Sequence, residues 1–142
     1  MPAQDRLRVA AASEWVLKAE NDLTTAAVLL KAGAKGPTDA TCFHAQQCVE
    51  KYIKAALVFR GVAFAKTHDI GVLMELLGGK PPIVLEPAVQ DRLTDYATVS
   101  RYPGEDEPIT LAEARQAVRI ARTVRREIRK LLPGASLRKK GK

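Results

Sequence analysis

Apolar residues recur at spacings of three and four residues along five stretches of the chain, which is the period of one helix face. These stretches are residues 13–31, 38–60, 68–77, 86–100 and 110–132. No stretch shows the sustained alternation of apolar and polar residues that is typical of a half-buried β-strand. The pattern therefore predicts an all-α fold, an up-and-down antiparallel helical bundle of four long helices and one short helix.

Capping residues and glycines mark the ends of the predicted helices. The expected N-terminal caps are Ser13, Thr38 or Asp39, Thr67 or Asp69, and Thr110, with Glu113 completing a capping box. Gly61 directly follows the second helix and is expected to stop it. We expect one domain over residues 1–134 and a basic, disordered tail over residues 135–142.

Length and composition exclude several classes of protein. The 142 residues suit one domain with an ordinary core. No apolar run approaches the roughly 20 residues of a membrane span, and residues 1–5 lack the basic and apolar regions of a signal peptide. Cys42 and Cys48 lie on nearly opposite faces of a helix, so we expect two buried or half-buried thiols in a reducing cytoplasm, not a disulfide.

The sequence also lacks the usual signatures of metal and nucleotide-triphosphate sites. Its two histidines do not have metal-ligand spacing, and no Walker-type glycine loop is present. The acidic run at residues 105–107 has the composition of a solvated loop. We therefore expect no metal and no cofactor.

The positive charge of the chain is concentrated near its C-terminus. The 23 basic and 16 acidic residues give 23 − 16 = +7. Residues 115–142 contain 11 basic residues and one acid, for +10, so residues 1–114 carry −3. Five arginines recur every three or four residues on one side of the last helix, namely Arg115, Arg119, Arg122, Arg126 and Arg129. Arginine binds phosphate in a bidentate manner, so this row indicates either an RNA- or nucleotide-binding surface or a solvated face with salt bridges.

Polar residues in three other places are candidate nucleotide or phosphate contacts. The second helix carries His44, Gln47 and Lys51 near its N-terminal half, where a helix favours phosphate. The alternative for His44 and Gln47 is a buried polar network or a dimer contact. His68 either lines a pocket or, with Asp69, caps the third helix. The loop after the predicted helix 86–100 contains Arg101 and Tyr102. These two residues could bind a phosphate and stack on a base, or pack a turn.

The polar pattern of the second helix also resembles a known family. Residues 42–57, CFHAQQCVEKYIKAAL, resemble the core helix of HEPN domains, the higher eukaryote and prokaryote nucleotide-binding family. The segments 66–70 and 96–103 and the helix 110–132 follow in the order and spacing of that family. The resemblance covers about residues 15–132.

This resemblance implies a helical bundle that is often a homodimer. Stand-alone prokaryotic members are often encoded beside a minimal nucleotidyltransferase, in pairs that resemble toxin–antitoxin systems. Some of these members are metal-independent ribonucleases, which carry an arginine, four to six residues, and then a histidine. In that chemistry the histidine transfers protons at the ribose or the leaving oxygen, and the arginine stabilises phosphate charge.

The chain departs from the ribonuclease pattern. Residues 37–39 precede His44 and residues 61–63 precede His68 at the required distance, and none of them is arginine. Arg60 lies one residue too far from His68. The strict motif is therefore absent, although its absence does not exclude binding.

The sequence favours a HEPN domain that binds nucleotide or RNA as a homodimer and acts with a nucleotidyltransferase partner. Two alternatives stay open. One is a ribonuclease toxin with a relaxed site, in which His44 or His68 acts with Arg60 or Arg101 across a dimer interface. The other is a module that only binds proteins, similar to an antitoxin.

Overall fold

The computed structural model describes residues 2–98 and 107–137, and this part of the chain is entirely helical outside its loops. Its elements are α1 (Ala3–Leu30), the 3-10 turn η1 (Gly33–Lys35), α2 (Thr38–Arg60), α3 (Ile70–Leu77), α4 (Pro87–Thr98), α5 (Leu111–Leu131) and α6 (Gly134–Leu137). The prediction of an all-α helical bundle is confirmed.

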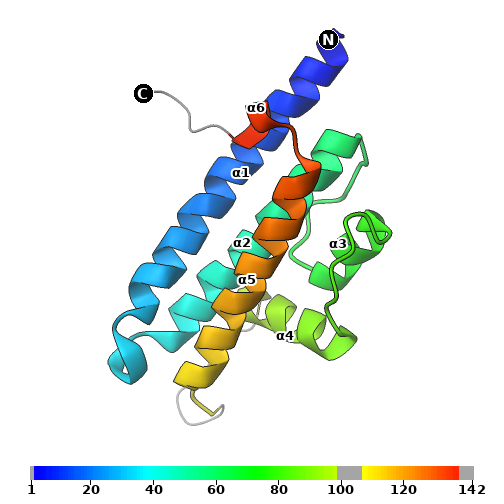
Figure 1. Ribbon diagram of the computed structural model, residues 1–142. Helices are drawn as coiled ribbons and strands as arrows, with labels where there is room; N and C mark the ends of the chain where they lie inside the picture. The colour runs from blue at the N-terminus through cyan, green and yellow to red at the C-terminus, as the bar shows by residue number, and fades with distance from the viewer. Residues whose placement is uncertain (1, 99–106, 138–142) are drawn as a thin grey trace.

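Helix α2 lies at the centre of the bundle. Helix α1 runs along one side of it, α5 along a second side, and the short helices α3 and α4 pack together over a third (Figure 1). Of the 23 residues of α2, 14 are buried, which is why its pattern is apolar on more than one face. Three alanines of α1 at seven-residue spacing, Ala12, Ala19 and Ala26, are fully buried, and their small side chains let α1 approach α2 closely.

Most helix ends have the predicted caps. Asp69 accepts a hydrogen bond from the backbone N–H of Val72, and Thr110 accepts one from that of Glu113. Gly61 ends α2 with a φ of 72°, a left-handed conformation that favours glycine.

Two helix starts differ from the prediction. Helix α1 begins at Ala3 and not at Ser13, because residues 3–12 are rich in strong helix formers although they lack a continuous apolar stripe. Helix α2 has no side-chain cap: its N-cap position is Pro37, and the Thr38 hydroxyl instead donates to the carbonyl of Ile109.

The C-terminal segment continues the fold beyond α5. Helix α6 packs against α1, and the Ser136 hydroxyl donates to the carbonyl of Val9 at 2.9 Å. The sequence analysis expects a disordered tail over residues 135–142, but residues 135–137 are helical and belong to α6. Residues 138–142 lie outside the described residues. Both cysteines are buried, as predicted, and neither is part of a disulfide. Within the described ranges, no helix is both long enough and apolar enough to cross a bilayer.

Candidate functional site

The first polar cluster joins α1 and α2 through Asp22. The Oδ1 atom of Asp22 lies 2.8 Å from Nδ1 of His44, and its Oδ2 atom accepts a hydrogen bond from Nζ of Lys51 at 2.5 Å. His44 and Lys51 are seven residues apart, so they lie on the same side of α2. Asp22 is 8% exposed, whereas the His44 side chain is 30% exposed. The buried carboxylate therefore orients a partly exposed imidazole through its Nδ1 atom.

A second cluster surrounds Glu50 on α2, and we call it the Glu50 cluster. Its Oε1 atom accepts a hydrogen bond from Nε2 of Gln46 at 3.0 Å and lies 2.8 Å from Nδ1 of His68, while its Oε2 atom accepts one from Nζ of Lys54 at 2.9 Å. Gln47 donates in turn to Oε1 of Gln46. Burial opposes ionisation of Glu50, but the hydrogen bonds from Lys54, Gln46 and His68 outweigh it and lower the pKa of the carboxyl.

Lys54, the cation of the Glu50 cluster, is buried beside two aromatic rings. Lys54 is 5% exposed, and its Nζ atom lies 5.4 Å from the ring centroid of Trp15 and 5.8 Å from that of Phe64. These are cation–π distances. His68 is the accessible member, with 57% of its side chain exposed. The cluster is thus a satisfied internal network with one imidazole at the surface.

A third cluster links α1, α2 and α5 through Glu20. Arg125 donates to both carboxylate oxygens, at 2.8 and 2.9 Å, and the Tyr52 hydroxyl donates to Oε2 at 2.7 Å. Arg129 donates to the Tyr52 oxygen at 3.3 Å. Burial again works against ionisation, but the bonds from Arg125 and Tyr52 lower the pKa of Glu20. Burial and the neighbouring Glu20 carboxylate raise the pKa of Tyr52, so its hydroxyl stays protonated.

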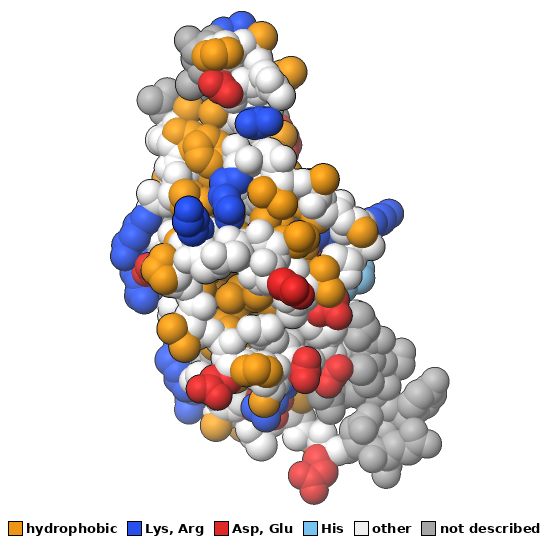
Figure 2. Space-filling view, turned by 90° about the vertical axis from the view of Figure 1, so that its right-hand side faces the viewer, with side chains coloured by type: hydrophobic (Ala, Val, Ile, Leu, Met, Phe, Trp, Pro, Cys, Tyr) orange, Lys and Arg blue, Asp and Glu red, His pale blue; other side chains and the backbone are white. Residues whose placement is uncertain are grey.

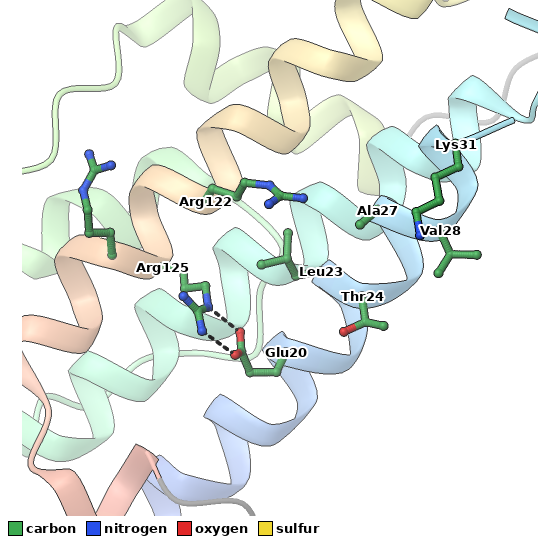
Figure 3. A pocket seen from close by; sticks show the side chains of 9 residues that line it. Glu20, Leu23, Thr24, Ala27, Val28, Lys31, Arg122 and Arg125 are labelled. Atoms are coloured by element: carbon green, nitrogen blue, oxygen red, sulfur yellow. Dashed lines mark hydrogen bonds and ion pairs between the residues drawn. The ribbon is translucent and has the colours of Figure 1, made fainter. Parts of the chain in front are cut away.

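An open groove of about 570 Å³ lies beside this third cluster, between α1 and α5. We call it the arginine groove. Its lining consists of Glu20, Leu23, Thr24, Ala27, Val28, Lys31, Arg122, Arg125 and Arg126. Four cations and one carboxylate give this lining a net charge of +3. Figure 3 shows that Arg125 is engaged by Glu20, whereas Arg122 extends from α5 toward α1 without an ion-pair partner among the side chains drawn.

The structure divides the residues predicted from the sequence between two surfaces. His44, Gln47, Lys51 and His68 belong to the first cluster and the Glu50 cluster, around α2. Arg122 and Arg126 line the arginine groove, and Arg115 and Arg119 are exposed nearer the start of α5. Arg119 donates twice to the Gln116 side chain.

Arg60, Arg101 and Tyr102 were also candidates for the site, and the structure describes only the first of them. Arg60 donates to the carbonyls of Leu77 and Lys80, so its described contacts stabilise the end of α3 and do not join it to a histidine. Arg101 and Tyr102 lie outside the described residues. Within the part of the chain that the structure describes, no group of three or more metal-ligating side chains occurs.

Sequence reasoning did not single out the carboxylates of α1 or two of the groove cations. Glu20 and Asp22 are the central acceptors of two clusters, and Arg125 and Lys31 line the groove. The spacing along α1 could have identified Asp22, because it lies three residues after Ala19 and four before Ala26 and is therefore on the buried side of the helix. A charged residue on the buried side of a helix needs a partner.

Charge is also segregated on the molecular surface. Figure 2 shows acidic side chains gathered on the lower half of the face in view, while basic side chains lie along its left edge and also in the middle of its upper half. In the sequence, the excess of basic residues lies in residues 115–142.

Comparisons with known proteins identify the family. The family model described as HEPN domain matches residues 12–131, which is nearly the whole of the described bundle. This chain belongs to the HEPN family. The crystal structure of ST0689, described as an archaeal HEPN homologue, has a TM-score of 0.63 and 25% sequence identity, and the comparison covers 86% of this HEPN chain and 98% of that chain.

A curated relative is similar over a shorter stretch. The protein named "Putative toxin MJ1304", from Methanocaldococcus jannaschii, is 36% identical over 63 residues. This match spans 44% of the HEPN chain and 40% of the relative, so the chain covers well under half of that protein.

Proposed function

We propose that this HEPN domain binds RNA through the arginine groove. The observation that carries the proposal is the charge of the groove: Lys31, Arg122 and Arg126 face it in addition to Arg125, whereas its only carboxylate, Glu20, is already paired with Arg125. Arg126 also donates to Glu127, outside the groove, and a surplus of cations in the lining attracts an anion. Phosphate is the anion for which clustered arginines are best suited.

The length of the basic surface favours an RNA strand over a single nucleotide. The exposed arginines of α5 extend from Arg115 to Arg126, which is 11 residues and about 16 Å of helix. That span exceeds one phosphate group and continues beyond the groove toward the start of α5. The described groove contributes no aromatic ring for base stacking, so binding through the backbone, with little sequence preference, is expected.

The biological setting belongs to the same proposal. The relative named as a toxin supports a role in a toxin–antitoxin-like pair, in which the domain acts as a homodimer with a minimal nucleotidyltransferase. Residues 1–114 have a net charge of −3, and the acidic side chains on the lower half of the face in Figure 2 provide a second face for such a protein partner.

Fluorescence anisotropy with a labelled single-stranded RNA of 12 nucleotides tests the binding site. The double variant Arg122→Glu, Arg126→Glu should bind at least tenfold more weakly than the wild type at low salt. Lys66→Glu, Lys80→Glu is the matched control, because it changes the net charge equally at two exposed lysines outside the groove. An equal loss in both variants would show that only the net charge of the protein matters. ATP and other mononucleotides should compete only weakly if an RNA strand is the ligand.

A second candidate function is RNA cleavage by the histidines, and the geometry of both imidazoles favours it. Each Nδ1 atom is held 2.8 Å from a carboxylate oxygen, of Asp22 for His44 and of Glu50 for His68. A carboxylate at Nδ1 fixes the ring orientation and leaves Nε2 to accept or donate a proton. Arg60 does not contribute in the described structure, since it is bound to backbone carbonyls.

Cleavage of total RNA by purified protein distinguishes this candidate from binding alone. If the histidines act in catalysis, His44→Ala or His68→Ala should reduce cleavage at least 100-fold, within the range contributed by general acid–base groups. RNA affinity should stay within twofold, because neither residue lines the arginine groove. Unchanged cleavage by the double histidine variant would remove both residues from any mechanism.

A further inference from the structure

Phe43 is an aromatic residue near the start of α2 that the fold leaves open to water. It is 38% exposed, although it is large and apolar. Its ring packs against the imidazole of the adjacent His44 in a T-shaped arrangement, with ring centroids 5.2 Å apart and an interplanar angle of 82°. In a T-shaped pair the edge of one ring meets the face of the other, so His44 covers at most one face of the Phe43 ring.

The first cluster brings positive charge to the same part of the surface. Asp22 orients His44 through its Nδ1 atom and accepts a hydrogen bond from Lys51, which lies on the same side of α2 as His44. Lys18 is exposed and lies one turn before Asp22 on the same side of α1. Two ammonium groups therefore stand against one buried carboxylate, and this surplus favours an anion beside the imidazole.

An exposed aromatic ring beside cations is the combination that binds single-stranded nucleic acid, because a base stacks on the ring while the cations meet the backbone. The arginine groove has cations but no aromatic ring in its lining. Among the large exposed hydrophobic residues in the described ranges, Phe43 is the one aromatic, and the others are aliphatic. The part of the chain that the structure describes therefore offers this ring as its most open stacking surface.

The first cluster and the arginine groove lie on opposite sides of α1. Glu20 lines the groove, whereas Asp22 holds the first cluster. Two residues along a helix correspond to a rotation of about 200°. A ligand at Phe43 and His44 would therefore be bound independently of the groove.

We propose that Phe43 stacks on one base of an RNA strand, with Lys18 and Lys51 at its phosphate and its ribose beside His44. We call this the Phe43 subsite. It favours purines, because stacking strength sets the preference at such sites and a purine presents the larger ring system. The inference deepens the second candidate function, since it names the nucleotide that His44 would receive, and it rests on RNA being the ligand.

Fluorine NMR of the intact chain tests the stacking directly. 4-Fluorophenylalanine at the three phenylalanines gives three signals, and Phe43→Leu identifies that of Phe43. The trinucleotide ApApA should move the Phe43 signal upfield, as a stacked ring does, and should move those of the partly buried Phe59 and Phe64 less. A ribose-phosphate trimer without bases should leave it in place. An unmoved Phe43 signal, or an equal shift with both strands, contradicts the subsite.

Base selectivity without the groove gives a second test. In the Arg122→Glu, Arg126→Glu background, a labelled six-nucleotide oligo(A) should bind at least about fivefold more tightly than the same strand without bases, the lower end of base stacking. Adding Phe43→Leu should bring this ratio close to one, and Phe43→Trp should keep it. Leu7→Ala is the matched control, because Leu7 is also exposed but lies near the far end of α1. A ratio that survives Phe43→Leu, with both affinities lowered alike, would mean that Phe43 is merely structural.

The same experiments separate the subsite from the proposed groove. If ApApA moves the Phe43 signal but Arg122→Glu, Arg126→Glu leaves the binding of the 12-nucleotide RNA unchanged, the subsite stands and the groove does not. If that variant loses RNA binding and the Phe43 signal does not respond, the groove stands and the subsite does not. If His44 cleaves RNA, the wild type should cut beside purines and Phe43→Leu should lose this preference. Cleavage by the wild type without base preference contradicts the subsite.

Discussion

The Glu50 cluster and the arginine groove each combine one carboxylate with cationic side chains but differ in how far those charges are matched. In the Glu50 cluster, the Glu50 carboxylate is matched by Lys54, Gln46 and His68 and is screened from water. In the arginine groove, one carboxylate faces four cations. A satisfied network has no electrostatic need for a ligand, so its charges contribute to fold and positioning. A surface with surplus charge of one sign attracts an oppositely charged ligand.

The largest expected effect is the removal of Glu50. Glu50→Ala would leave Lys54 buried without its carboxylate partner, and breaking a buried pair costs about 3–5 kcal/mol. Urea unfolding followed by circular dichroism should show this loss of stability. The folded fraction should bind RNA like the wild type. A stability change below about 1 kcal/mol would mean that the cluster is not a structural network.

The pH dependence of stability tests the same carboxylate from another direction. The pKa of Glu50 is lowered in the folded state, so its ionised form contributes stability at and above pH 4.5 that is lost as the pH falls through the folded pKa. Glu20 follows the same sign because its pKa is also lowered. The urea concentration at the midpoint of unfolding of the wild type should therefore decrease as the pH is lowered below about 4.5. A midpoint that stays constant between pH 7 and pH 3 contradicts these assignments.

A smaller effect is expected at Tyr52, which is buried between the two regions. Tyr52→Phe removes the hydroxyl that donates to Glu20 and accepts from Arg129. The loss should be about 1 kcal/mol, the net value of an ordinary hydrogen bond. Thermal melting gives the measurement, and the groove should keep its RNA affinity because Arg125 still pairs with Glu20. A decrease in the free energy of unfolding of more than about 3 kcal/mol would mean that the hydroxyl stabilises the core by more than an ordinary hydrogen bond.

The smallest effect has the opposite sign. Glu20→Gln removes the only carboxylate of the arginine groove and releases Arg125 for a phosphate. RNA affinity should rise by about two- to fivefold, within the range of a surface ion pair. Anisotropy at two salt concentrations measures it. Weaker RNA binding by this variant would mean that Glu20 shapes the site in a way that outweighs its charge.

The helical bundle could be predicted from the sequence because its main signals are local. Apolar periodicity, Gly61 and the caps Asp69 and Thr110 determine where most helices begin and end. The sequence pattern did not predict the first turns of α1, because residues 3–12 lack a continuous apolar stripe.

The candidate site was less predictable, because its contacts join residues far apart in the chain. Glu20 and Arg125 are 105 positions apart, and Asp22 and Lys51 are 29 apart. Composition indicated a basic surface on α5 but could not identify which arginines are neutralised by a carboxylate. Only the packing of α1 beside α5 shows that Arg125 is paired with Glu20 and that Arg122 and Arg126 line the groove, where Arg126 also donates to the adjacent Glu127.

The salt dependence of RNA binding by the wild type tests the central claim most directly. Three surplus cations that contact phosphates predict a plot of log affinity against log salt concentration with a slope of about −2, since each contact with a single strand contributes about −0.7. The Arg122→Glu, Arg126→Glu variant should have a slope of about −0.7 or smaller in magnitude. A wild-type slope near zero, or equal slopes for the two proteins, would contradict RNA binding in the arginine groove.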